Sequence, residues 1–162
     1  MTDFIQAQGL IFLPHILRRL ANRFSDACDE VFADFGLVVP TNLVSTTHLL
    51  FAQGPAAVTD IAAAIGQSHP FVIKGLKELK SLGLVSTRSD PKDGRRTIVA
   101  LTAKGKLQAQ RLLDARPAFE AAYRRLMGEA GAELFEPLWR MEDALRTTPF
   151  AERIKIERER LG

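Results

Sequence analysis

The sequence predicts a mainly α-helical protein that contains one small β-hairpin. Apolar residues recur at helical spacing over most of the 162 residues. The period changes to two only between about residues 84 and 101, where turn-forming residues separate two short stretches of strand-forming residues. Two short helical segments joined by a glycine-containing turn directly precede this hairpin. These three observations predict a helix-turn-helix followed by a β-wing, with further helices on both sides.

The first long helix is expected from about residue 8 to residue 35. Its apolar stripe repeats every three or four positions and comprises Ile16, Leu20, Phe24, Cys28, Val31 and Phe35. Gly36 is expected to end this helix as a C-terminal cap. A second helix is expected over residues 41–53, because Gly54 and Pro55 break the pattern there.

Residues 59–83 predict the helix-turn-helix itself. Thr59 is expected to cap a short helix over residues 60–65, which Gly66 closes. Ser68 is expected to cap a longer helix, which ends at Gly83 and whose buried face carries Val72, Leu76 and Leu79.

The wing and the remaining helices complete the predicted fold. Strands are expected over residues 85–88 and 97–101, around a turn rich in aspartate, proline and glycine. Thr102 is expected to cap a helix that reaches about residue 127, with a kink at Pro117 and interruptions at Gly128 and Gly131. A final helix has one apolar stripe, which comprises Leu134, Leu138, Met141 and Leu145. Three alternatives stay open for the charged tail after residue 149: it extends, frays or clasps a partner.

Positive charge is concentrated in the segment that holds the helix-turn-helix and the wing. Residues 68–106 carry nine basic and three acidic side chains, a net charge of +6, whereas the whole chain has a formal charge of +3. Such a basic segment in a near-neutral chain is typical of a protein that binds a polyanion. A solvated charged face would give the same composition.

Several classes of function are not expected from this sequence. The single cysteine excludes an internal disulfide and fits a reducing cytoplasm, and there is neither a signal peptide nor an apolar run long enough to span a membrane. The three histidines have no partners at metal-ligand spacing, and no phosphate loop or catalytic motif is present. We therefore expect a cytoplasmic protein with no metal, no cofactor and no enzymatic activity.

The motifs around the hairpin resemble those of the MarR family of transcription regulators. The strongest match is the run from Leu82-Gly83-Leu84-Val85 through Asp90-Pro91-Lys92-Asp93-Gly94-Arg95-Arg96 to Leu101-Thr102-Ala103-Lys104-Gly105. Weaker matches occur earlier in the chain, in the family's order, at Gly36-Leu37, Pro40, Thr59-Asp60-Ile61-Ala62 and Ile65-Gly66. The resemblance implies a winged helix-turn-helix lobe over residues 37–105 and a helical dimerisation region over residues 1–36 and 106–162. It further implies a homodimer that binds a palindromic operator in double-stranded DNA as a repressor.

The resemblance also implies which residues contact DNA. Arg95 would enter the minor groove with its guanidinium held by Asp93, while Lys92 and Arg96 would neutralise phosphates. Phe71 and Ile73 depart from the family, which commonly has hydroxyl residues there; they either contact thymine methyl groups or pack inside. The complete expected set is Ser68, His69, Phe71, Ile73, Lys74, Lys77, Arg88, Lys92, Asp93, Arg95 and Arg96.

Three alternatives remain open at this stage. Relatives bind small aromatic or lipophilic anions in a cleft, whose residues here would be His15, Arg19, Thr47, His48 and Phe51. These residues equally suit ordinary partly buried positions. A winged helix adapted to protein–protein contact would use Phe71 and Ile73 as its apolar anchor. A redox-sensing regulator would use Cys28, although its place on an apolar stripe favours a small core residue.

Overall fold

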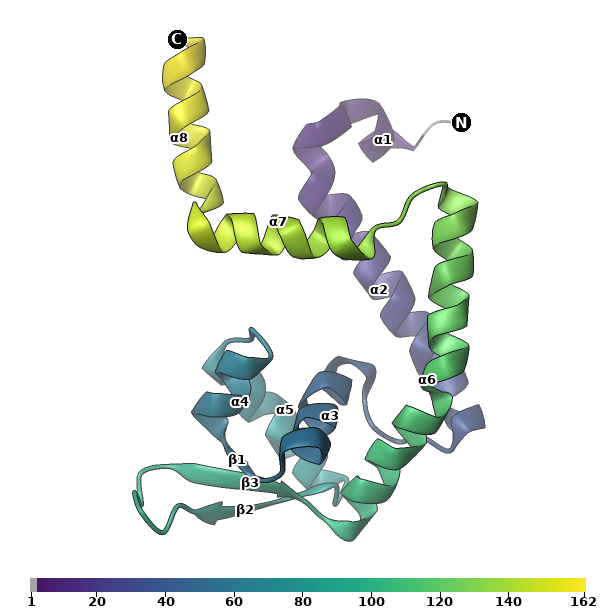
Figure 1. Ribbon diagram of the computed structural model, residues 1–162, viewed down its shortest axis with the longest axis vertical. Coiled ribbons are helices and arrows are strands. Elements are labelled where there is room, and N and C mark those ends of the chain that lie inside the picture. The colour runs from purple at the N-terminus through teal and green to yellow at the C-terminus, as the bar shows by residue number, and fades with distance from the viewer. Residues whose placement is uncertain (1–2) are drawn as a thin grey trace. The chain divides into compact units, whose positions relative to one another are not determined.

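The computed structural model describes residues 3–162 of the chain, which divides into two compact units, Met1–Arg116 and Pro117–Gly162. The first unit contains the helix-turn-helix and the wing, and the second contains helices (Figure 1). Among the described residues, no helix is long and apolar enough to cross a membrane.

The expected first helix is present, but a 3₁₀ turn interrupts it near its N-terminal end. The helical elements are α1 (Phe4–Gln8), the 3₁₀ turn η1 (Gly9–Phe12), α2 (Leu13–Phe32) and the 3₁₀ turn η2 (Ala33–Phe35). Gly36 follows in the left-handed conformation with φ +64°, which confirms the predicted cap.

A three-stranded sheet and three helices form the winged helix-turn-helix. After the 3₁₀ turn η3 (Thr41–Leu43), the chain forms α3 (Val44–Gln53), β1 (Ala56–Ala57), α4 (Val58–Ala64), α5 (His69–Ser81), β2 (Val85–Ser89) and β3 (Thr97–Leu101). The antiparallel sheet has the order β1-β3-β2. Its hairpin pairs Val85 with Leu101 and Ser89 with Thr97, so β2 is one residue longer than predicted.

The short strand β1 was not predicted, and it corrects the expected start of α4. Ala56 and Ala57 pair with Val99 and Ile98 of β3, so the backbone is extended up to residue 57. The helix therefore begins at Val58, and Thr59 lies inside its first turn instead of capping it. Ser68, in contrast, caps α5 as predicted, because its hydroxyl accepts a hydrogen bond of 3.3 Å from the backbone N–H of Phe71.

The core of the first unit lies between α3, α4, α5 and the sheet. The predicted inner residues of α5 are buried there together with residues from each neighbouring element, and the cluster includes Leu43, Leu50, Ile61, Val72, Leu76, Leu79, Leu84 and Val99. This core fixes the orientation of α5, because one face of the helix is enclosed and the opposite face is left to solvent.

The helices after the wing are longer than the sequence indicated. They are α6 (Ala103–Ala130), α7 (Phe135–Thr147) and α8 (Phe150–Leu161). The chain remains helical through Gly128, so the predicted interruption there is wrong, whereas Gly131 ends the helix with φ +68°. Helix α6 also continues through Pro117, directly after the boundary between the two units. The charged tail forms the unpredicted α8.

A buried side chain attaches α6 to the loop after α2. The amide oxygen of Gln108 accepts a hydrogen bond of 2.7 Å from the backbone N–H of Val38, and its amide nitrogen donates one of 3.0 Å to the carbonyl of Gly36. Arg111 donates a second hydrogen bond to the same carbonyl. Because these groups are seventy or more positions apart in the sequence, they hold the start of α6 in place beside this loop.

Candidate nucleic-acid interface

The exposed face of α5 carries a row of residues spaced by four, four and three positions. This row consists of His69, Ile73, Lys77 and Lys80, all of which are exposed. The opposite face supplies Val72 and Leu79 to the core. An amphipathic helix with cations on its outer face and a capped, exposed N-terminus is suited to contact a polyanion.

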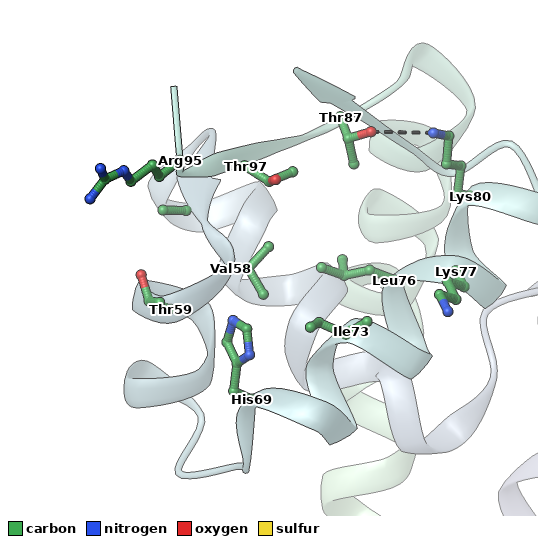
Figure 2. A pocket seen from close by; sticks show the side chains of 11 residues that line it. Val58, Thr59, His69, Ile73, Leu76, Lys77, Lys80, Thr87, Arg95 and Thr97 are labelled. Carbon is green, nitrogen blue, oxygen red and sulfur yellow. Dashed lines mark hydrogen bonds between the residues drawn. The ribbon is translucent and has the colours of Figure 1, made fainter. Parts of the chain in front are cut away.

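A shallow cleft of about 380 Å³ lies beside this row of α5. Its walls come from α5, from the start of α4 and from the two strands of the wing (Figure 2). The apolar side chain of Val58, from α4, faces those of Ile73 and Leu76, from α5 (Figure 2). Lys80 donates a hydrogen bond of 3.3 Å to the hydroxyl of Thr87 at one side of the cleft. The full lining is Ala57, Val58, Thr59, His69, Ile73, Leu76, Lys77, Lys80, Thr87, Arg95 and Thr97.

The turn of the wing is organised by two aspartates that accept backbone hydrogen bonds. Asp90 accepts from the N–H of Lys92 at 2.8 Å, and Asp93 accepts from the N–H of Arg95 at 3.0 Å. The resemblance had implied that Asp93 holds the guanidinium of Arg95. In the structure Asp93 shapes the turn from which the Arg95 side chain projects (Figure 2), and its contact with the guanidinium stays a prediction.

Arg96 connects the wing to the helix-turn-helix. Its Nη2 atom lies 2.7 Å from Oδ2 of Asp60, in the first turn of α4. The two side chains are 41% and 60% exposed, so the pair lies at the surface. The guanidinium that was expected on a DNA phosphate therefore has a partner within the protein, thirty-six positions away in the sequence.

The structure separates the two apolar residues that depart from the family pattern. Phe71 is half-buried and packs against the core, which agrees with the second of the two alternatives left open for it. Ile73 is 39% exposed and lines the cleft. The two positions differ by two residues, which places their side chains about 200° apart around the helix axis. The two side chains therefore cannot face the same side of the helix.

The other expected DNA-contacting residues lie on the same lobe. Lys74 on α5, Arg88 on β2 and Lys92 in the turn are exposed. Sequence reasoning missed seven of the lining residues, among them Lys80, Thr87 and Thr97. Lys80 was detectable, because it continues the helical row from Lys77; the two threonines became neighbours of α5 only through the strand pairing.

The five residues suggested for a ligand have different environments. Thr47 is fully buried, and its hydroxyl donates a hydrogen bond of 3.0 Å to the carbonyl of Leu43, so it serves the core. Arg19 donates to Asp3 at 2.7 Å and holds the pKa of that carboxyl below its usual value. Phe51 is half-buried, and two exposed residues complete the set, His15 and His48.

Each unit exposes large apolar side chains along its helices. In the first unit they include Leu10, Ile11, Leu17, Leu20 and Val31 of η1 and α2. In the second, none of the described residues of α7 is buried, and those exposed include Leu138, Trp139, Met141 and Leu145. Cys28, on α2, is half-buried and forms no disulfide.

Residues 48–96, which hold the helix-turn-helix and most of the wing, match the model of the MarR family. A comparison with curated protein sequences found no match. Among solved structures, MosR of M. tuberculosis in complex with DNA is similar at a TM-score of 0.65 and 21% identity, over 85% of this chain and 98% of that one.

Two further solved structures share the fold. The S. aureus MepR–DNA complex has a TM-score of 0.62 and 20% identity, over 83% of this chain and 94% of that one. PcaV of Streptomyces coelicolor with its natural ligand has a TM-score of 0.61 and 19% identity, over 94% of this chain and 100% of that one. The predicted mainly α-helical winged-helix fold and the resemblance to MarR-type proteins are thereby confirmed. MosR and PcaV are described as transcriptional regulators.

Proposed function

We propose that this chain is a transcription regulator that binds double-stranded DNA as a homodimer and represses from a palindromic operator. The observation that supports this proposal most directly is that α5 and the wing line the same surface cleft. These are the two parts of a winged helix that contact DNA, and here they place Lys77, Lys80 and Arg95 around the cleft. Two structures with this fold, MosR and MepR, were solved in complex with DNA.

In this proposal each element of the lobe has a distinct part. Helix α5 enters the major groove, where His69, Ile73 and Lys74 approach base edges and Lys77 approaches phosphates. Arg95, at the end of the wing, enters the minor groove, where narrow A·T tracts concentrate negative potential. Arg96 acts through its pair with Asp60, which holds the wing against α4.

The proposed dimer uses the helices outside the winged lobe, residues 1–36 and 106–162. The exposed apolar side chains of α2 and α7 support this assignment, because surfaces of this kind on a water-soluble chain mark interfaces. A two-fold dimer presents two α5 helices to successive major grooves about 34 Å apart, which explains the preference for a palindromic site.

A small lipophilic or aromatic anion is the proposed effector. PcaV was solved with its natural ligand, and regulation of DNA binding by 6-hydroxynicotinic acid is described for BpsR of Bordetella bronchiseptica. Here, His15, Arg19 and His48 offer cationic or hydrogen-bonding groups, and Phe51 offers a ring. Thr47 is excluded from the proposed ligand site, because its side chain is fully buried in the core.

The experiment that tests the proposal is fluorescence anisotropy with the duplex upstream of the protein's own gene and with a scrambled duplex, at two salt concentrations. Tighter binding to the upstream duplex, weakened steeply by salt, is expected because several lysines and arginines release counterions. No binding to either duplex at low salt would refute DNA binding and favour the protein-contact alternative.

Arg95→Ala tests the wing assignment within that assay. The loss of one groove contact is expected to weaken binding by about 1–3 kcal/mol per site, while Arg95→Lys, which keeps the charge, retains part of the affinity. Unchanged affinity of the alanine variant would show that the wing does not contact the groove.

A further inference from the structure

Ile73 interrupts an otherwise polar and cationic helix face. It occupies the centre of the row on α5, four residues after His69 and four before Lys77. Its neighbours Val72 and Leu76 are 2% and 6% exposed, whereas Ile73 is 39% exposed. The core therefore encloses Val72 and Leu76, whereas the side chain of Ile73 stays exposed beside the cleft (Figure 2).

An isoleucine on this face selects among the groups that a DNA groove presents. Its side chain has neither a donor nor an acceptor, so it gains nothing from the polar edges of guanine, adenine or cytosine. In the major groove the 5-methyl group of thymine is the apolar group presented by the base pairs. A methyl group placed against Ile73 would leave water for an aliphatic surface, which is favourable.

The charges around Ile73 favour DNA over an apolar partner as its occupant. Lys77, Lys80 and Arg95 line the same cleft, and Lys80 is held at its edge by the hydroxyl of Thr87. Among the residues that line the cleft, none is acidic. A surface with an apolar centre and a cationic rim complements a thymine whose flanking phosphates meet the rim.

We infer that Ile73 is a specificity-determining residue that contacts the 5-methyl group of a thymine in each half-site of the operator. This inference rests on the proposed function, since it requires α5 to lie in the major groove. Phe71 has no part in it, because that ring packs against the core. The operator then requires thymine at one position, symmetric in the two half-sites, where uracil is a poorer substitute.

Replacement of thymine by deoxyuridine isolates this contact, because it removes the methyl group and leaves every hydrogen-bonding atom of the base pair in place. The probe is a duplex selected by the full-length protein from a randomised library, then resynthesised with deoxyuridine at one symmetric pair of positions at a time. Burial of one methyl group corresponds to about a fourfold change in Kd, so roughly a 15-fold loss is expected for the two half-sites together.

The matched variants are Ile73→Ser and Lys77→Gln. Ile73→Ser is expected to bind the thymine and uracil duplexes equally at the sensitive position, because serine has no methyl group to place against the 5-methyl group of thymine. Lys77→Gln is expected to weaken both duplexes equally and to preserve the preference for thymine, since it removes a charge and leaves Ile73 in place.

The outcomes separate the inference from the proposed function. Tight binding to the selected duplex, with no loss of affinity on deoxyuridine substitution at any position, would overturn the role of Ile73 without contradicting the proposed function. This measurement needs only the unaltered protein. A preference for thymine that persists in Ile73→Ser would also overturn it. Failure to enrich any duplex would refute the proposed function itself.

Discussion

Replacing Asp60 by asparagine removes the carboxylate that pairs with Arg96 at 2.7 Å, and its effect on DNA binding distinguishes two roles for this arginine. If Arg96 holds the wing against α4, loss of the pair releases the wing and weakens binding. If Arg96 instead contacts a phosphate, Asp60→Asn frees the guanidinium and removes a negative charge near DNA, so binding becomes tighter. The two roles predict changes of opposite sign.

The structure limits the size of the effect. The pair is single and at the surface, with the two side chains 41% and 60% exposed. Exposed pairs of this kind contribute about 0.2–1 kcal/mol, because solvent screens them and both side chains lose freedom. We therefore expect Asp60→Asn to weaken binding by up to about fivefold per wing. In a dimer with two distant wings the changes add as free energies, so the limit is about 25-fold.

A double-mutant cycle with Arg96→Gln completes the measurement. Fluorescence anisotropy at four or more salt concentrations gives both Kd and the dependence of log Kd on log salt for each variant. A positioning role predicts that the double variant binds no more weakly than Arg96→Gln alone, and that the salt dependence of both single variants matches the unaltered protein. A phosphate contact predicts a slope reduced by about 1 for each Arg96 removed.

Tighter binding by Asp60→Asn, together with a reduced slope for Arg96→Gln, would refute the positioning role. Thermal unfolding of each variant serves as the control, because a change in folding would otherwise mimic a change in binding. Both side chains are exposed, so we expect shifts in unfolding free energy of no more than about 1 kcal/mol.

Two further predictions concern stability and assembly. Gly105→Ala is expected to destabilise the fold by about 3 kcal/mol or more in urea unfolding, since its Cβ would lie 2.0 Å from the backbone oxygen of Leu84. Gly128→Ala in the same helix has nothing within 4 Å of its Cβ and should raise stability by up to about 1 kcal/mol; an equal loss in both would contradict the steric reasoning. Leu20→Glu, on the exposed apolar stripe of α2, is expected to shift the sedimentation-equilibrium mass from dimer to monomer. Asn22→Glu, at another exposed position of α2, adds the same charge and should leave the dimer intact; a dimeric Leu20→Glu would argue against this interface.

The sequence alone determined those features that depend on residues close together in the chain. Helical spacing predicted α3, α5 and the buried face of α5, and the caps at Ser68, Gly36 and Gly83 were predicted because each depends on a few neighbouring positions. The alternating pattern around the turn predicted the hairpin. The basic segment predicted where a polyanion would bind, since a local excess of charge is visible without a fold.

Only the tertiary structure decided which residues meet across the chain. Strand β1 has two alanines and no pattern of its own; it exists because β3 offers an unpaired edge, and this pairing moved the start of α4 away from Thr59. The Arg96–Asp60 pair likewise joins segments thirty-six positions apart. Local patterns carry no information about such contacts, because they form when separate elements pack together.

Two of the apolar residues of α5 show this division most directly. Phe71 and Ile73 are both hydrophobic, and composition alone allowed either to be buried or to face DNA. Helical geometry determined that they point in different directions, but not which direction the core would occupy. The packing of α5 against α3, α4 and the sheet decided that Phe71 lies against the core and that Ile73 remains exposed.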